Sequence, residues 1–167
     1  MNYETLLSAL ADGNVEFVIV GGVAATFHGS ARFTSDLDIV YGRSAANIER
    51  LAAAVAPLSP YLRGAPPGLP FRFDPKTIRA GLNFTLTTTA GPLDLLGDMA
   101  GGFDYEGLRD RAIEAEIFGR RVKVIDLESL IKAKRAARRP KDLETIAELE
   151  VIREERPADD SGRPSKT

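Results

Sequence analysis

The chain has 167 residues, of which 44% are hydrophobic and 28% are charged, values typical of a single globular domain. Its 22 basic and 24 acidic residues give a formal net charge of -2, which argues against a protein that coats nucleic acid over its whole surface. Cysteine is absent and His28 is the single histidine, so disulfide scaffolds, cysteine-held metals, thiol nucleophiles and multi-histidine metal sites are excluded.

The first 55 residues predict helices that alternate with strands. Residues 3–11 place leucines on one side of an amphipathic helix, whereas residues 15–20 are apolar enough for a strand buried on both faces. A Gly-Gly pair then ends that strand and opens a short helix. The expected elements are helix 3–11, strand 15–20, helix 23–27, strand 37–41 and a helix capped by Ser44 that runs to Val55.

Residues 57–75 differ from the rest of the chain because they hold six of its ten prolines. Proline removes a backbone donor and disfavours both helices and central strands. The segment therefore predicts an ordered surface loop or a mobile lid.

The rest of the chain predicts two β-hairpins followed by helices. The hairpins pair strand 83–89 with 92–96 and strand 113–118 with 121–125. Asp126 caps a helix that is interrupted at Pro140 and continues over 141–155, and the polar residues 157–167 predict a disordered tail. This order of elements predicts an α+β domain over 1–156, with a small mixed β-sheet, flanking helices and a C-terminal helical pair.

Three aspartates are the main candidates for chemistry. Asp36 and Asp38 lie two residues apart on a predicted strand, so both side chains point to one face, with Cα atoms about 7 Å apart. Asp94 lies among leucines on another short strand, where a charge is costly unless it is paired or binds metal. Converging carboxylates repel each other unless a cation lies between them, and Mg²⁺ suits oxygen ligands. A solvated strand end is the alternative for Asp36 and Asp38 taken alone.

The Gly21-Gly22 pair follows a buried strand and opens a helix. Such a turn exposes backbone N–H groups at a helix N-terminus, which suits phosphate. Taken alone, the pair is better explained as an ordinary strand-to-helix turn.

Together, Gly21-Gly22, Asp36-Leu37-Asp38 and Leu93-Asp94-Leu95 resemble the signature of the polymerase-β-like nucleotidyltransferase superfamily. The pattern from His28 to Asp38 and the segment 130–142 are similar to small bacterial nucleotidyltransferases near the AbiEii-type toxins. The resemblance covers about residues 15–150. It implies the nucleotidyltransferase fold, a nucleoside triphosphate donor, two Mg²⁺ ions and transfer of a nucleoside monophosphate to an acceptor hydroxyl.

The resemblance also implies roles for single residues. Asp36, Asp38 and Asp94 would be the catalytic and metal-binding residues, and Asp94 could also deprotonate the acceptor hydroxyl. The residues expected to bind the nucleotide are Gly21, Gly22, Arg32, Thr34 and Lys134. Arg63, Arg72 and Arg79 flank the proline-rich segment and are candidates for contact with the acceptor.

Residues 132–141 hold six of the 22 basic residues, and a solvated helical face is the ordinary explanation for such a run. At about 100° per residue, however, Lys134 and Arg138 fall near the inward stripe of this helix. We therefore expect Lys134 to reach triphosphate oxygens and Arg138 to point along the protein body. For Asp142, pairing with a nearby base is the better explanation than a direct catalytic role.

Two further candidates have competing explanations. Arg32 could bind a phosphate or form a surface ion pair, and Thr34 could orient a carboxylate or bind phosphate. His28 could act in catalysis or simply hydrogen-bond a carbonyl at the end of its helix.

The sequence leaves the acceptor open among RNA, protein and a small molecule, and it does not show which base the donor carries. A role in a toxin–antitoxin pair would add an antitoxin protein as partner. A non-catalytic nucleotide-binding regulatory module and an antibiotic nucleotidyltransferase are the competing functions, although the tryptophan-containing glycine turn of the latter is missing because the chain has no tryptophan. The first residues lack a basic secretory region and no apolar run has the length of a membrane span, so we expect a cytoplasmic protein with no membrane contact.

Overall fold

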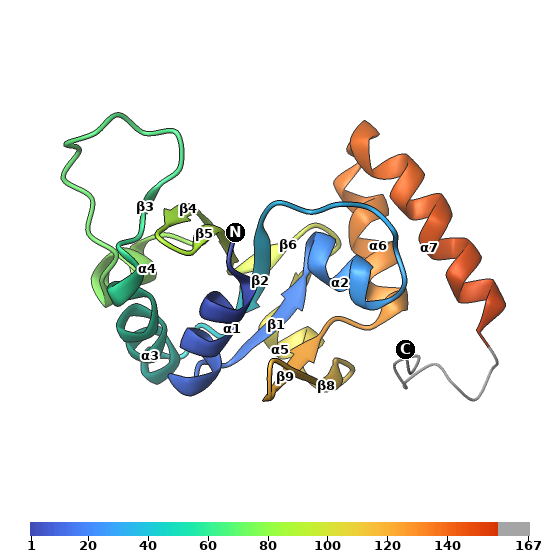
Figure 1. Cartoon of the computed structure of the whole chain (residues 1–167), viewed down its shortest axis with the longest axis horizontal. Coiled ribbons are helices and arrows are strands. Elements are labelled where there is room, and N and C mark those ends of the chain that lie inside the picture. Colours follow the sequence, from blue (N-terminus) through green and yellow to red (C-terminus); the bar gives the residue numbers. More distant parts are fainter. Residues whose placement is uncertain (157–167) are drawn as a thin grey trace.

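The computed structural model describes residues 1–156, and the expectation of a disordered tail over 157–167 lies outside these residues (Figure 1). Side chains cap two helices of the N-terminal part, α1 and α3. The helix α1, Tyr3–Asp12, follows Asn2, whose side chain accepts a hydrogen bond from the Thr5 amide. The helix α3, Ala45–Val55, follows Ser44, which accepts from the Asn47 amide and confirms the predicted cap.

A mixed seven-stranded sheet forms the centre of the domain, in the order β3-β4-β5-β2-β1-β9-β8 (Figure 1). The β1/β9 and β2/β5 pairs are parallel, and the other pairs are antiparallel. This agrees with the predicted α+β class and mixed sheet. The strands are β1 Phe17–Val20, β2 Leu37–Tyr41, β3 Tyr61–Leu62, β4 Phe84–Thr88, β5 Gly91–Leu96, β8 Ile113–Ile117 and β9 Arg120–Val124.

The pairing of β2 with β5 positions the functional side chains. Leu37 lies opposite Leu93, and Asp38 lies opposite Asp94. Because side chains alternate along a strand, both leucines point into the core, where they are fully buried, and both aspartates point to the other face. The alternation that the sequence predicts for this region is therefore confirmed.

A strand inside the proline-rich segment and a helix that begins at its last residue, Pro75, were not predicted from the sequence. The strand β3 pairs with β4 at the edge of the sheet, where no neighbour on its outer side needs the donors that proline lacks. The helix α4, Pro75–Ala80, begins with proline at its first position, and Asp74 caps it by accepting from the Thr77 amide. Prolines are compatible with regular structure at a sheet edge and at the start of a helix. The number of prolines alone therefore did not reveal these two elements. Between these two elements the chain forms a long loop (Figure 1).

The second half of the chain follows the predicted order. The predicted hairpins β4–β5 and β8–β9 are present. Three short elements lie between them: the strands β6, Asp98–Met99, and β7, Phe103–Asp104, which pair as a small hairpin, and the helix α5, Tyr105–Leu108. The helix α2, Gly21–Phe27, lies near α6, Leu127–Ala137. The helices α6 and α7, Leu143–Glu155, pack side by side as the expected C-terminal pair (Figure 1). The turn η1, Ala56–Leu58, follows α3, and η2, Pro140–Asp142, joins α6 to α7.

Across the described part of the chain, no helix combines the length and the apolar character needed to cross a lipid bilayer.

Candidate active site

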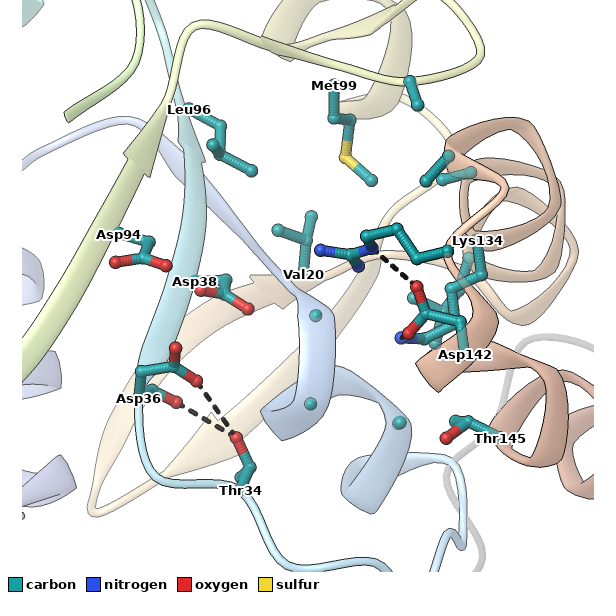
Figure 2. Close-up of a pocket in the computed structure, with 18 of the residues that line it drawn as sticks. Val20, Thr34, Asp36, Asp38, Asp94, Leu96, Met99, Lys134, Asp142 and Thr145 are labelled. Carbon is teal, nitrogen blue, oxygen red and sulfur yellow. Dashed lines mark hydrogen bonds and ion pairs between the residues drawn. The ribbon is translucent and has the colours of Figure 1, made fainter. Parts of the chain in front are cut away.

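Three carboxylates converge on the polar face of the sheet. Asp36, Asp38 and Asp94 each offer an oxygen, and these oxygens all lie within 4.8 Å of one another (Figure 2). Asp38 is on β2 and Asp94 is its neighbour on β5. The prediction that Asp36 is also on the strand is wrong, because β2 begins at Leu37, but its side chain still reaches the other two. The convergence expected from the spacing is thus present.

Burial and the two neighbouring acids change the protonation of Asp38. Burial, followed by the charges of Asp36 and Asp94, raises the pKa of Asp38 from 3.8 to about 7, and the positive charge of Lys134 only partly opposes this. Thr34 steadies the group, since its Oγ1 lies 3.3 Å from both Oδ1 and the backbone oxygen of Asp36 (Figure 2). This supports the expectation that Thr34 orients a carboxylate.

The Gly21-Gly22 pair lies directly against this cluster. Gly21 has a φ of +64°, and a Cβ there would lie 2.0 Å from Oδ2 of Asp38. A Cβ on Gly22 would lie 2.5 Å from Oγ1 of Thr34. Both glycines are therefore required by the close approach of the carboxylate and the hydroxyl, in addition to forming the turn into α2.

The acids open into a cavity of about 770 Å³, within the usual range for small-ligand sites. Its walls come from the sheet, the segment before β2, and the helices α6 and α7 (Figure 2). Most residues predicted to act at the site line it: Gly21, Gly22, Arg32, Thr34, Asp36, Asp38, Asp94, Lys134 and Asp142. His28 and Arg138 are not among the lining residues.

Lys134 lies on the cavity wall across from the acids, as helical spacing predicts. Its side chain is 10% exposed, and its Nζ lies 3.2 Å from Oδ1 of Asp142. Arg139 donates to the other Asp142 oxygen at 2.7 Å. Burial acts to raise the pKa of Asp142, but the two cations more than offset it and hold that pKa below its ordinary value. Asp142 is thus paired with nearby bases, which was its preferred explanation.

His28 lies outside the cavity lining and forms the carbonyl contact that was its alternative explanation. The ring is buried, and its Nε2 lies 2.7 Å from the backbone oxygen of Ile125, to which it donates. Arg156 lies 3.3 Å from Nδ1 and donates to the His28 carbonyl. Burial lowers the pKa of His28, which favours the neutral ring that these contacts require. His28 therefore ties the end of α2 to the segment after β9, and its carbonyl partner lies outside its own helix.

The expectation for Arg138 is also wrong. The helix α6 ends at Ala137, and Arg138 takes a left-handed conformation with φ of 52°, so helical spacing no longer describes its direction. Its side chain is exposed, and Arg139 lines the cavity instead.

Arg32 forms surface ion pairs, which the sequence analysis gave as the alternative to phosphate binding. Its guanidinium lies 2.7 Å from Glu144 and 3.4 Å from Glu148, both on α7. Glu148 also accepts from the Ala31 amide at 2.8 Å. The segment before β2 is therefore fastened to the C-terminal helix.

The contact between Arg63 and Asp94 was not predicted from the sequence, and it is the most informative of the unexpected contacts. Arg63 follows β3, and its Nη2 donates to Oδ1 of Asp94 and to the Leu86 carbonyl, both at 2.7 Å. The sequence placed Arg63 beside the proline-rich segment without a partner, because the edge strand that directs it was not predicted. Leu96 at the end of β5 and Met99 on β6 form an apolar wall above the acids, which the sequence analysis did not anticipate (Figure 2).

No protein-family model matches the sequence, and no curated protein sequence is significantly similar to it. Several solved structures share its fold. The antibiotic-resistance factor ANT(2'')-Ia, in solution, aligns over 94% of this chain and 83% of its own, with 18% identity and a TM-score of 0.57. The lincosamide antibiotic adenylyltransferase LnuA, bound to lincomycin, aligns over 91% of this chain and 98% of its own, with 14% identity and a TM-score of 0.59.

A third structure, an antigenic nucleotidyltransferase-like protein from Paracoccidioides brasiliensis, aligns over 89% of this chain and 72% of its own, with 17% identity and a TM-score of 0.52. These likenesses extend over nearly the whole described domain. The chain therefore has the fold of the nucleotidyltransferases, as its resemblance to the polymerase-β-like superfamily implied.

Proposed function

We propose that this chain is a Mg²⁺-dependent nucleotidyltransferase that moves a nucleoside monophosphate from a nucleoside triphosphate to an acceptor hydroxyl. The observation that carries the proposal is the convergence of Asp36, Asp38 and Asp94 beside a Gly-Gly turn, inside a cavity large enough for a nucleotide. The fold that the chain shares with an antibiotic-resistance factor and with a lincosamide antibiotic adenylyltransferase supports the proposal.

The residues fit a hard divalent cation. All three donors are carboxylates, and burial together with the charges of Asp36 and Asp94 raises the pKa of Asp38, so a bound cation would favour the charged form of Asp38. Asp36, Asp38 and Asp94 would hold the metal. When bound, two such ions supply Lewis-acid stabilisation of negative charge on the phosphoryl oxygens.

In the proposed reaction, the acceptor oxygen forms a bond to the α-phosphorus, and the bond from that phosphorus to the bridging oxygen of the departing pyrophosphate breaks. The hydroxyl proton passes to the Asp94 carboxylate, which Arg63 holds in place through Oδ1. Lys134 adds positive charge on the opposite wall, where the triphosphate would lie. These residues mainly position the reactants and balance charge, which is how phosphoryl transfer is catalysed.

For the acceptor, we favour a small-molecule hydroxyl. One related structure is described as a complex with adenylyl-2''-tobramycin and another as lincomycin-bound, so a small-molecule hydroxyl, as in an antibiotic nucleotidyltransferase, is the candidate that these likenesses favour. A tRNA or protein acceptor, a toxin–antitoxin role with an antitoxin partner and a cytoplasmic location are retained from the sequence as further proposals. A module that binds nucleotide without turnover is the competing function, and the intact third acid counts against it.

A transfer assay separates these functions. The purified chain is incubated with Mg²⁺, each of four triphosphates labelled at the α-phosphate, and tRNA, protein or aminoglycoside and lincosamide acceptors. We expect label transfer and pyrophosphate release with at least one pair, abolished in Asp38→Asn and retained in Asp98→Asn, an exposed acid of the same cavity. Metal-dependent triphosphate binding without pyrophosphate release from any pair would establish the non-catalytic module instead.

A further inference from the structure

Phe33 is the most exposed large hydrophobic residue of the described chain, with 93% of its surface accessible. Single exposed apolar residues are common on protein surfaces and carry no meaning by themselves. Phe33 differs from the other exposed ones in its place, because it lines the cavity that holds the three acids. Phe118, for comparison, is 47% exposed in the turn between β8 and β9 and lies outside this cavity.

The residues on both sides of Phe33 are held in place by contacts with other parts of the chain. On one side, Arg32 is paired with Glu144 and Glu148 of α7. On the other, the Thr34 carbonyl accepts a hydrogen bond of 2.8 Å from the Tyr3 hydroxyl. Phe33 therefore lies at the cavity between two residues, Arg32 and Thr34, whose positions are fixed by contacts with other parts of the chain. The ring of Phe33 itself is almost fully exposed, so its packing contributes little to stability.

The position of Phe33 identifies which substrate it faces. Thr34 lies over Gly22, at 2.5 Å from where a Cβ would be, so this segment covers the turn beside which the triphosphate is expected. Asp94 and Arg63, where the acceptor hydroxyl would be activated, belong to the β4–β5 side of the site. Phe33 is three residues from Asp36, a separation of at most about 11 Å along extended backbone, which a nucleotide held by its phosphates can bridge.

We propose that Phe33 is a binding residue for the donor, on which the base of the nucleoside triphosphate stacks. This inference rests on the proposed function. An aromatic face binds every base, because each base has a π-face, so Phe33 would add affinity with little choice among bases. The ring has two side-chain torsions, so little conformational freedom is lost when it is covered.

The test compares ligands with and without a base. Binding of α,β-methylene analogues of ATP, GTP, CTP and UTP and of inorganic tripolyphosphate, each with Mg²⁺, is measured by calorimetry for the wild type and for Phe33→Ala, Phe33→Tyr and the matched control Phe118→Ala. We expect Phe33→Ala to weaken binding of every nucleotide analogue by roughly 5- to 100-fold and to leave tripolyphosphate binding unchanged. Phe33→Tyr, which keeps the ring, and Phe118→Ala should bind the analogues like the wild type.

The outcomes separate this inference from the proposed function. Equal nucleotide affinity in Phe33→Ala and the wild type would overturn the stacking role while leaving the proposed function intact. A parallel loss of tripolyphosphate binding in Phe33→Ala would also overturn it, because the effect would then not involve the base. Failure of the wild type to bind any of these ligands with Mg²⁺ would refute both.

Discussion

The protonation of Asp38 leads to a prediction about stability. In the metal-free protein its pKa is raised from 3.8 to about 7 by burial and by the neighbouring acids Asp36 and Asp94. A carboxyl whose pKa is higher in the folded state favours folding when it is protonated. That contribution is complete below about pH 4 and is lost as the pH rises to about 7. The neutral, equally sized amide in Asp38→Asn avoids the loss.

The size of the effect follows from the same difference. A pKa raised from 3.8 to about 7 corresponds to roughly 4 kcal/mol of unfolding free energy at pH 8.5. This is an upper value, because water in the open cavity screens the carboxylates. We therefore expect Asp38→Asn to be more stable than the wild type by about 1–4 kcal/mol at pH 8.5, and the gap to shrink toward zero near pH 4.

Urea unfolding in EDTA at a series of pH values measures this gap, with Asp98→Asn as control because Asp98 lines the cavity but is exposed. Added Mg²⁺ should stabilise the wild type at pH 8.5 and have much less effect on Asp38→Asn, since a cation that binds only the folded state raises its stability. A variant less stable than the wild type at pH 8.5, or a gap that does not change with pH, would refute the electrostatic reasoning.

Two further predictions concern the surroundings of the acids. Gly21→Ala should weaken Mn²⁺ binding and lower the free energy of unfolding by about 1–3 kcal/mol, because the new Cβ would displace Asp38 and the backbone at this position is left-handed. The control is Gly119→Ala, where φ is also positive but the space around the Cβ is open. This control should lower the stability less and should bind Mn²⁺ like the wild type. Arg63→Met should weaken Mn²⁺ binding about 10- to 100-fold, because the third carboxylate loses the donor that orients it. Arg43→Met, which removes an arginine bonded to backbone carbonyls outside the cavity, should not. Unchanged Mn²⁺ affinity in Gly21→Ala or in Arg63→Met would contradict the reasoning for that residue.

The parts of the site that the sequence predicted depend on local periodicity. Asp38 and Asp94 share a face because side chains alternate along β2 and β5, and Lys134 points inward because the helix α6 is regular up to Ala137. One residue past that helix end the same arithmetic failed for Arg138, whose left-handed backbone turns the side chain away. The periodicity of a helix or strand predicts where a side chain points only as far as that helix or strand extends.

Contacts between distant segments were not accessible in this way. Arg63 reaches Asp94 through a short edge strand that prolines concealed, and His28 meets the Ile125 carbonyl 97 residues further along the chain. Phe33 carried no signal as a single aromatic residue in a polar segment. Its exposure and its position on the cavity emerge only when the segment is fastened to α7.

We propose that the three acids hold divalent cations next to a nucleoside triphosphate. Crystals of the full chain grown with Mn²⁺ and α,β-methylene-ATP, measured for manganese anomalous scattering, test it most directly. We predict manganese peaks between Asp36, Asp38 and Asp94, with the triphosphate extending toward Gly21 and Lys134. Nucleotide bound elsewhere, or bound in this cavity with no manganese at the three carboxylates, would contradict the claim.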